Sequence, residues 1–402
     1  DPFYKKKMED IKNGIESVKN LGKLKKDIAN KLYGRENNSP TSIETFVKCQ
    51  FNYFCKYGLK IKTRKKNEFD SLETGSFIHY VIENIVREYL NSSGPFDLEE
   101  NIKSIIKMYI NETIPDYDQR SARFKYLFKR LYKIILGFVS NLIYELNNSD
   151  FKPLDFELEI NENGDLKPLI IDKKNNLSIT GKIDRVDGFE KDSKLYIRII
   201  DYKTGRKVLA YDELYYGIGL QMFLYLFAIW KNGKEKYKKE IVPAGVIYSP
   251  VVLDKINVSN RYVKEEDLIK KLMNQNKGSG LLIDDYDIIM AMDKTGEFEM
   301  LPLAVKDGYI SDKCGNVASI ERLGKLYSFT EKKLIEIIKE IKEGGVAINP
   351  YKDSNNGFDS CAYCDMYEAC RKEYDPKNIR KMKKIDRETF WQMVEGGKNN
   401  EC

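Results

Sequence analysis

The chain has 402 residues, of which 42% are hydrophobic, so it can bury a large core as one big domain or two ordinary ones. Its 68 Lys and Arg residues exceed its 62 Asp and Glu residues by six, which excludes a histone-like polycation but allows local basic tracks. The most apolar window, residues 214–230, is about 17 residues long and contains two Gly and a Gln. We therefore predict a buried helix there and no membrane span.

The start of the chain and its cysteines indicate a compartment. The chain begins at Asp1 with neither an initiator Met nor a signal-peptide pattern, so we expect a fragment or processed form of a cytoplasmic protein. Such a protein rarely carries disulfides, and an odd number of cysteines favours metal or cluster chemistry over a secreted disulfide scaffold. The seven cysteines are Cys49, Cys55, Cys314, Cys361, Cys364, Cys370 and Cys402.

The first 147 residues are predicted to be mainly helical. Residues 1–36 form a Lys-rich helix without a strong apolar stripe, and the GRENNSP segment (34–40) ends it as a linker. Residues 41–59 form a helix capped near Thr41 or Ser42, with Cys49 in it or just past its end. Residues 72–90 and 98–147 are also helical. The apolar residues of the 72–90 helix recur at helical spacing, at Phe77, Ile78, Val81, Ile82 and Ile85, and this helix carries His79, the single histidine.

From Asp155 onward the hydrophobic period changes to two, which is typical of strands. The predicted strands cover residues 155–160, 177–187, 194–204 and 244–251, with an apolar helix at 212–231 before the last one. Residues 330–345 form a helix that ends in Gly, and a loop-rich tail carries the last cysteines. Residues 283–325 have a mixed pattern. The sequence contains no internal repeat and no phosphate-binding P-loop motif.

Three charges interrupt the two central strands at Asp184, Asp201 and Lys203. A two-residue turn at 191–192 would place Asp184 opposite Ile199 and diagonal to Asp201, and any even-length loop keeps both carboxylates on one face. Period two adds Lys203 to that face. Two such carboxylates can share a hard divalent cation, and the ammonium can orient a water molecule or stabilise developing phosphate charge. A solvated strand face with alternating Asp and Lys is the alternative.

Four motifs together resemble those of RecB-type PD-(D/E)XK nucleases. GKIDRVD (181–187) and IIDYKTG (199–205) are similar to the second and third metal motifs of that family. GSFIHYVIE (75–83) resembles its helical histidine motif, and GLQMFLYLFA (219–228) its Gln/Tyr motif. The resemblance implies an α/β, restriction-endonuclease-like core: a mixed central sheet flanked by helices, with helical insertions.

The resemblance also implies roles for individual residues. His79, Asp184 and Asp201 would hold Mg²⁺ or Mn²⁺, the backbone carbonyl of Tyr202 would complete the inner shell, and Lys203 would activate the attacking water.

Further residues of the implied site lie outside these two strands. Gln221 and Tyr225 would position the substrate strand. Glu157 matches a family glutamate, and Glu159 is close enough in sequence to be confused with it.

The C-terminal cysteines have a Cys-x2-Cys-x5-Cys spacing that lets Cys361, Cys364 and Cys370 converge on one centre, which needs a fourth ligand. The resemblance implies that Cys49 supplies it and that the four cysteines bind a [4Fe-4S] cluster, a structural clasp around the nuclease fold. Cys55 is close enough in sequence to compete with Cys49. Neither Cys314 nor Cys402 has an assigned role.

The order of motifs is most similar to the C-terminal nuclease domain of the B subunits of AddAB-type helicase/deoxyribonucleases, over roughly residues 41–375. Residues 1–40 would be a helical lead-in and residues 376–402 a basic tail. The departures are Gln50, where that family usually has Pro, and CRKEYD (370–375), which replaces the more common Cys-Arg-Phe-Asp ending. The first departure bears on the geometry around Cys49.

This branch implies an exonuclease that cuts single DNA strands, the 5′-terminated ones, while double-strand breaks are processed. Its partners would be DNA, an AddA-like helicase/nuclease subunit and the missing N-terminal part of its own chain, and no membrane. Two alternatives are a stand-alone iron–sulfur exonuclease of the CRISPR-adaptation type and a non-catalytic DNA-binding or scaffolding subunit that retains the fold.

Basic segments at 60–66, 120–133 and 379–384 are candidates for nucleic-acid binding. In the second, Arg123, Lys125, Lys129 and Arg130 alternate with aromatic residues that could stack on unpaired bases. Solvated helix faces with the aromatic residues in the core are an equal alternative.

Overall fold

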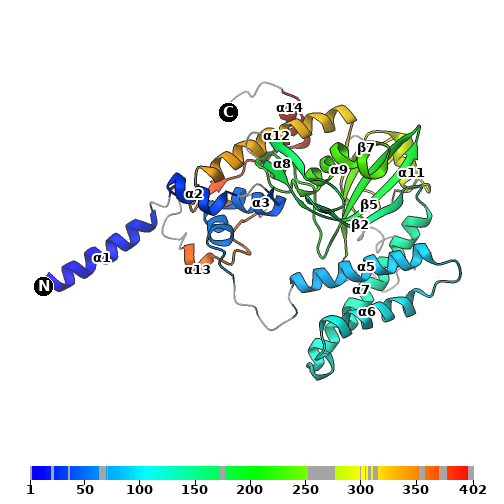
Figure 1. The fold of residues 1–402 in the computed structure, drawn as a ribbon, viewed down its shortest axis with the longest axis horizontal. Helices are drawn as coiled ribbons and strands as arrows, with labels where there is room; N and C mark the ends of the chain where they lie inside the picture. Colours follow the sequence, from blue (N-terminus) through cyan, green and yellow to red (C-terminus); the bar gives the residue numbers. More distant parts are fainter. Residues whose placement is uncertain are drawn as a thin grey trace.

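The computed structural model describes residues 2–19, 22–34, 37–62, 69, 71–172, 177–251, 277–298, 300–303, 305–306, 309–310, 316–352, 358–370 and 378–396. A twisted sheet lies at the centre, with helices on both of its faces, and α1 (Pro2–Lys19) projects from the body (Figure 1). The expected α/β architecture, a mixed sheet flanked by helices, is confirmed. None of the described helices is long and apolar enough to cross a membrane.

The central sheet has six strands in the order β11-β8-β7-β6-β5-β2. The pairs β6–β7 and β8–β11 are parallel, and the other three pairs are antiparallel. The strands are β2 (Lys152–Ile160), β5 (Gly181–Lys191), β6 (Lys194–Lys203), β7 (Glu240–Pro250), β8 (Ser279–Ile283) and β11 (Val317–Ala318). Smaller pairings join β1 (Asn37–Asn38), β3 (Leu169–Asp172) and β4 (Leu177–Ile179), β9 (Val305–Lys306) and β10 (Tyr309–Ile310), and β12 (Tyr351–Lys352) and β13 (Arg380–Lys381).

Two groups of helices cover the sheet. The long helices α5 (Ser71–Asn91), α6 (Leu98–Thr113) and α7 (Ala122–Asn147) form a bundle on one side, and α9 (Gln221–Tyr237) and α12 (Ile320–Lys342) lie on the other (Figure 1). The remaining described helices are α2 (Lys26–Tyr33), α3 (Pro40–Lys48), α4 (Gln50–Tyr53), the π-helix η1 (Phe54–Gly58), the 3-10 helix η2 (Tyr117–Gln119), α8 (Tyr211–Tyr216), α11 (Tyr286–Met292), α13 (Tyr367–Cys370) and α14 (Arg387–Val394).

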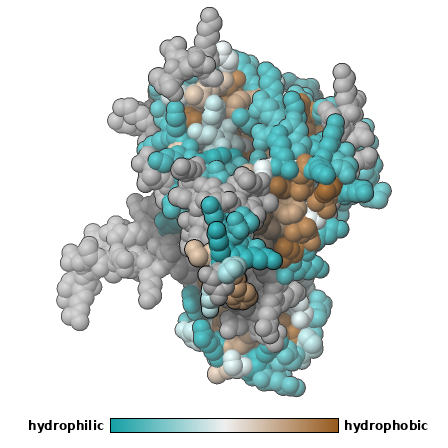
Figure 2. All heavy atoms as spheres, turned by 90° about the vertical axis from the view of Figure 1, so that its left-hand side faces the viewer, coloured by the Kyte–Doolittle hydropathy of each residue, from teal (hydrophilic) through white to brown (hydrophobic). Residues whose placement is uncertain are grey.

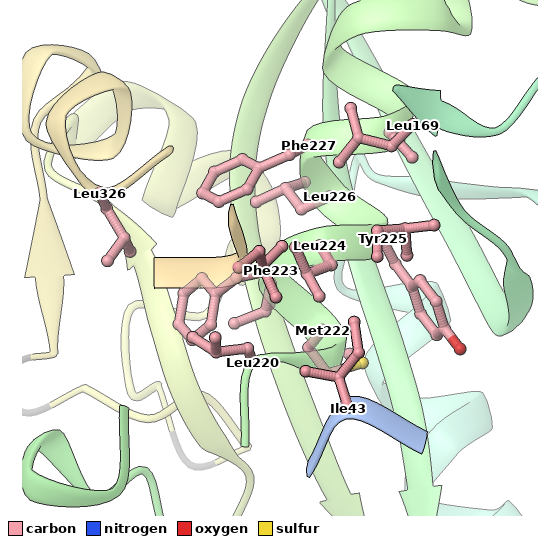
Figure 3. Packing of buried hydrophobic residues seen from close by; sticks show 14 of the residues in the cluster. Ile43, Leu169, Leu220, Met222, Phe223, Leu224, Tyr225, Leu226, Phe227 and Leu326 are labelled. Carbon is pink, nitrogen blue, oxygen red and sulfur yellow. The ribbon is translucent and has the colours of Figure 1, made fainter. Parts of the chain in front are cut away.

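Each face of the sheet has its own hydrophobic core. The core on the α9 side contains α9 and α12 side chains with Ile199 and Val246, whereas the core on the α5–α7 side contains Ile200 and Ile247. The apolar residues expected on the histidine helix are buried in the second core, since Phe77 and Ile85 are fully enclosed. Figure 3 shows the tight apolar packing around α9, with Ile43 of α3 beside Met222.

Several local predictions are wrong. The single helix expected over residues 1–36 is divided into α1 and α2, and the single strand expected over residues 177–187 is divided into β4 and β5. The β5–β6 turn lies at Asp192 and Ser193, because both adopt positive φ (51° and 61°), as a two-residue hairpin turn requires. The region 212–231 is not one helix, because Gly217, with φ of +88°, ends α8 before α9 begins. The cap of α3 is Ser39, whose side chain accepts from the Ser42 backbone N–H, and Pro at the next position favours that start.

Figure 2 views the side from which α1 projects. Among the side chains that it colours, hydrophilic ones are widespread, and the largest group of hydrophobic ones lies at the right of the view.

Candidate active site

Three side chains from three elements converge at one edge of the sheet. The Nδ1 atom of His79, on α5, lies 3.5 Å from Oδ1 of Asp184 on β5 and 3.9 Å from Oε1 of Glu157 on β2. One potential ligand atom from each of the three lies within 4.8 Å of the others. All three residues are partly buried, so they form a sheltered group of an imidazole and two carboxylates. Such a group could hold a divalent cation.

Glu157 has an unusual backbone conformation, since its φ is +54° inside β2. A non-glycine residue in this region stores strain, which often marks a functional position. Its other carboxylate oxygen accepts from the ammonium of Lys182 at 2.6 Å. Glu159, the alternative in the sequence, instead accepts from the Asn161 side chain at 3.0 Å and lies outside the group. The structure therefore places Glu157, and not Glu159, beside His79.

Asp201 and Lys203 come from β6, the strand next to β5. Because Arg185 pairs with Ile200, one further step of the register sets Asp184 directly opposite Asp201, and not on the diagonal that the sequence suggested. Both carboxylates are still on the same face, and Lys203 forms an ion pair with Asp201. Asp201 is not a member of the 4.8 Å group.

The surroundings of Asp184 favour its protonated form. Burial, followed by the Asp201 carboxylate, raises the pKa of Asp184 to about 6, although His79 and the Tyr202 N–H oppose this shift. That N–H donates to Asp184 Oδ2 at 2.8 Å. Two neighbouring carboxylates with little water repel one another, and a bound divalent cation would relieve that repulsion.

Tyr202 contributes its backbone to the site and its side chain to the opposite face. Its carbonyl oxygen lies 2.9 Å from Nε2 of His79. Two ligands at right angles around Mg²⁺, each at about 2.0–2.1 Å, are separated by about 2.9 Å. The His79–Tyr202 distance therefore suits a hydrogen bond and also suits two atoms that share one such cation.

The Gln221 and Tyr225 pair lies at the start of α9. The Tyr225 hydroxyl hydrogen-bonds the Lys182 backbone and the Gln221 side chain, and burial raises the pKa of Tyr225, with smaller contributions from Asp201 and Asp184. A Cβ atom added to Gly181 would lie only 2.2 Å from that hydroxyl oxygen. In Figure 3 the hydroxyl points away from the apolar cluster around α9. The glycine that starts β5 therefore makes room for a tyrosine oriented by the GKIDR strand.

A buried ionic network lies beneath the site on the α5–α7 face. The Asp187 carboxylate accepts from Arg185 at 2.8 Å (to each oxygen) and from Arg198 Nε at 3.0 Å. Arg185 also donates to the Tyr202 hydroxyl at 2.9 Å, and Arg198 donates to Glu145 of α7 at 2.7 Å. Asp187 and both arginines are fully buried. Sequence reasoning missed this network, although these charges interrupt the same two strands as Asp184 and Asp201.

Five cysteines lie in one neighbourhood. Cys49 ends α3 and shares a buried cluster with Cys55 and Cys370, while Cys364 packs against it. Burial raises the pKa of Cys364, and the thiols of Cys49, Cys361 and Cys370 raise it further. The chain thus brings Cys49 to the C-terminal trio across more than 300 residues. Cys314 and Cys402 lie outside the described residues.

Among the described residues, no three cysteine sulfurs lie within 4.8 Å of one another, so these thiols share a neighbourhood without forming a close-packed group.

Two residues brace this cysteine cluster. Gln50 accepts from the Ala347 N–H at 3.3 Å, donates to Glu340 at 3.2 Å, and its own N–H donates to the Asn349 side chain at 3.1 Å. Arg380 donates to the Val47 carbonyl oxygen at 2.5 Å. Gln50, the residue after Cys49, is thus bound to residues 347–349, which precede the cysteine trio in the chain. The Arg380 guanidinium binds the Val47 carbonyl oxygen, two residues before Cys49.

The basic segments differ in exposure. In residues 120–133, Arg123, Lys129 and Arg130 are exposed, whereas Lys125 donates to the Asp118 carbonyl oxygen at 2.7 Å. Phe124 and Phe128 of the same segment pack in the helical bundle. Tyr126, in contrast, is 63% exposed, so the segment has an exposed basic face that includes one aromatic ring. Residues 63–66 lie outside the described residues, and Arg380 of the third segment faces the cysteine cluster.

Fold and site together define a class of protein. A model of the PD-(D/E)XK nuclease superfamily matches residues 37–371, so the chain belongs to that superfamily.

Individual relatives are more specific than the superfamily. The chain is 31% identical to the B subunit of the ATP-dependent helicase/deoxyribonuclease of Clostridium tetani, over 92% of this chain and 33% of the relative. It is 29% identical to the protein of the same name from Clostridioides difficile, over 92% and 33%. For that of Acetivibrio thermocellus the identity is 31%, over 85% and 30%. The chain spans about a third of the length of these relatives.

Proposed function

We propose that this chain is a metal-dependent deoxyribonuclease domain of a helicase–nuclease, which hydrolyses phosphodiester bonds of single DNA strands. The observation that carries the proposal is the convergence of His79, Glu157 and Asp184, with Asp201 and Lys203 beside them. The membership in a nuclease superfamily and the similarity to helicase/deoxyribonuclease B subunits support it.

Mg²⁺ or Mn²⁺ fits the donor set. The donors are carboxylate oxygens, one imidazole and the Tyr202 carbonyl oxygen, which suit hard divalent cations. His79, Asp184, Asp201 and the Tyr202 carbonyl would hold the ion, with Glu157 in support. When bound, such an ion polarises the phosphate and lowers the pKa of a nearby water.

The chain's own groups provide the rest of the chemistry. Lys203, paired with Asp201, is placed to orient a water for in-line attack and to stabilise the negative charge that develops on the phosphate. Gln221 and Tyr225 present polar groups at the N-terminal end of α9, where they would hold the substrate strand. The strained Glu157 would help to fix the His79 ring.

We also propose that Cys49, Cys361, Cys364 and Cys370 bind a [4Fe-4S] cluster with a structural role. Their common neighbourhood and the motif resemblance support this assignment. Cys55 is buried in the same cluster and is the alternative fourth ligand; the motif resemblance favours Cys49, which lies at the end of α3 next to Gln50.

DNA and a helicase/nuclease partner subunit of AddA type would complete the machine. The exposed Arg123, Lys129 and Arg130 would contact the strand's phosphates, and Lys125 would hold the start of α7 against η2. The enzyme would act as an exonuclease during the processing of double-strand breaks.

A cleavage assay tests the proposal. The chain, purified anaerobically, should degrade labelled single-stranded DNA in Mg²⁺ or Mn²⁺ and should be inactive in EDTA. Asp201→Ala and Lys203→Ala should each lower the rate by at least about a hundredfold. Equal activity in the parent and both variants would refute the proposed site, and a parent that only binds DNA would favour the scaffolding alternative.

A further inference from the structure

Lys207 lies in the loop that follows β6, four residues after Lys203. Its ammonium nitrogen lies 4.4 Å from the centre of the Tyr248 ring. Tyr248 pairs with Asp201 in the parallel β6–β7 ladder, so both side chains project from the same face of the sheet. The Lys207 ammonium therefore lies above the face that carries Asp184, Asp201 and Lys203.

The surroundings hold Lys207 in this place. Its carbonyl oxygen accepts from the Ser279 hydroxyl at 2.5 Å, and Tyr248 beneath it donates to the Gly219 carbonyl oxygen at 3.4 Å. The Gly219 N–H donates to Glu44 of α3 at 3.1 Å. Gly219 is two residues before Gln221, so the Lys207 loop is linked to the start of α9, where the substrate strand would lie.

The charges around Lys207 leave it without an oxygen partner. Glu44 is paired with Lys48, and Asp201 is paired with Lys203. In the part of the chain that the structure describes, no carboxylate forms an ion pair with the Lys207 ammonium, and no acceptor is hydrogen-bonded to it. Burial lowers the pKa of Lys207, with partial opposition from Glu44 and Asp201. A sheltered ammonium normally gains an anionic partner, and the face of an aromatic ring offsets only part of that need.

We propose that Lys207 binds a backbone phosphate of the substrate strand, next to the phosphodiester that is cleaved. The proposal rests on the proposed nuclease function and extends it by a second lysine. Lys203 acts at the reacting phosphate, whereas Lys207 supplies a fixed cation for its neighbour. A phosphodiester has the oxygens that Lys207 lacks, and one charge-assisted contact of this kind also fixes the register of the strand.

Strand binding by the 402-residue chain tests the proposal directly. Binding of a labelled single-stranded oligonucleotide is measured by fluorescence anisotropy in Ca²⁺, with the strand checked for cleavage on a gel. Lys207→Gln should weaken binding roughly tenfold to a hundredfold. It should also reduce the slope of log affinity against log salt by about 0.7, the value for one phosphate contact on a single strand. Lys207→Arg should keep most of the affinity.

Lys236→Gln is a matched control. Lys236 also lies over a tyrosine ring, 5.6 Å from the centre of Tyr237, but it is paired with Asp155 at the far end of α9. About 15 residues of helix, or about 22 Å, separate it from Gln221. Lys236→Gln should leave both affinity and salt slope unchanged. An unchanged affinity and slope in Lys207→Gln would overturn the proposal.

A methylphosphonate scan locates the contact. Each phosphate of the oligonucleotide is made neutral in turn, and the effect is measured in the parent and in Lys207→Gln. At one position the two changes should not add, because both remove the same contact. Additive effects at every position would refute a phosphate contact by Lys207. If the parent shows this coupling but cuts no DNA in Mg²⁺ or Mn²⁺, the nuclease proposal fails and the Lys207 contact stands.

Discussion

Nε2 of His79 lies 2.9 Å from the carbonyl oxygen of Tyr202, while Nδ1 of the same ring faces Asp184. The two ring nitrogens therefore have different partners. If Nε2 and the carbonyl share the cation, a glutamine at position 79 can replace the ligand, because its amide reaches about as far as Nε2. An asparagine reaches only as far as Nδ1.

His79→Gln should thus retain more Mn²⁺ affinity than His79→Asn, by about tenfold, in isothermal titration calorimetry. Thermal unfolding of the metal-free variants controls for a general loss of structure. A higher Mn²⁺ affinity in His79→Asn than in His79→Gln would show that Nδ1 is the metal ligand. The Tyr202 carbonyl oxygen would then be a hydrogen-bond acceptor that orients the ring.

The Asp187 network should make a large and pH-dependent contribution to stability. Asp187→Asn leaves Arg185 and Arg198 buried without their carboxylate, which should lower the free energy of unfolding by about 3–5 kcal/mol at pH 7. The two arginines hold the pKa of Asp187 below its ordinary value against the effect of burial. A carboxylate with a lowered folded-state pKa stabilises the fold above its unfolded pKa, about 4, and this contribution is lost as pH falls towards the folded-state pKa.

Urea unfolding of the parent and of Asp187→Asn should therefore differ most at about pH 6–7 and progressively less below about pH 4. Asp150→Asn removes an exposed ion pair with Lys294 and should change stability by at most about 1 kcal/mol. A difference that does not depend on pH would show that the ionised carboxylate is not the source of the stability.

The two N-terminal cysteines should behave differently. Cys49→Ser should abolish the visible iron–sulfur absorption of anaerobically purified protein and lower its iron content, and it should reduce thermal stability. Cys55→Ser removes a buried thiol of the same cluster and should keep both the absorption and the iron. The opposite result would identify Cys55 as the fourth ligand, and a colourless, zinc-containing parent would rule out the cluster.

Gly181→Ala should disturb the Tyr225 hydroxyl, because the new methyl group would lie 2.2 Å from it. We expect a drop in kcat/KM of about tenfold or more in the cleavage assay, since the polar group at the start of α9 must move. Gly205→Ala lies in the same region of the site, and its added methyl group would have no atom within 4 Å apart from its chain neighbours, so it should have little effect. Equal rates in Gly181→Ala and the parent would contradict the proposed role of this contact.

Charge reversal of the exposed residues Arg123, Lys129 and Arg130 should weaken single-strand binding and lower the salt slope by about 2, from three contacts of about 0.7 each. The control is a second triple variant with the same net charge, in which Lys234, Lys238 and Lys239, near the C-terminal end of α9, are reversed. If both triple variants bind alike, the helix α7 does not form part of the DNA track.

Much of the fold followed from periodicity in the sequence. The histidine helix and the β6 strand are long and strongly patterned, and their positions are confirmed, whereas the strand expected at 177–187 is divided into β4 and β5, and β5 continues to Lys191. The errors fall on turns: two adjacent positive-φ residues at 192–193 shifted the hairpin by one position, and Gly217 divided a continuous apolar run into two helices. Such backbone conformations depend on tertiary packing, which hydrophobic patterning does not record.

The site could be outlined but not completed from sequence. Period two and a hairpin were enough to bring Asp184, Asp201 and Lys203 together, and motif resemblance added His79. Lys182 and Lys207 could not be found this way, because their positions depend on the bulged β2 strand and on a loop that crosses Tyr248. The Arg185–Asp187–Arg198 network had a visible signal, since charged residues recur within apolar strands.

The most direct measurement is a crystal structure of the chain with Mn²⁺, in which anomalous scattering locates the ion. The account predicts an anomalous peak within about 2.5 Å of an imidazole nitrogen of His79 and of carboxylate oxygens of Asp184 and Asp201. A well-ordered crystal with no such peak, or with Mn²⁺ bound only elsewhere, would contradict it.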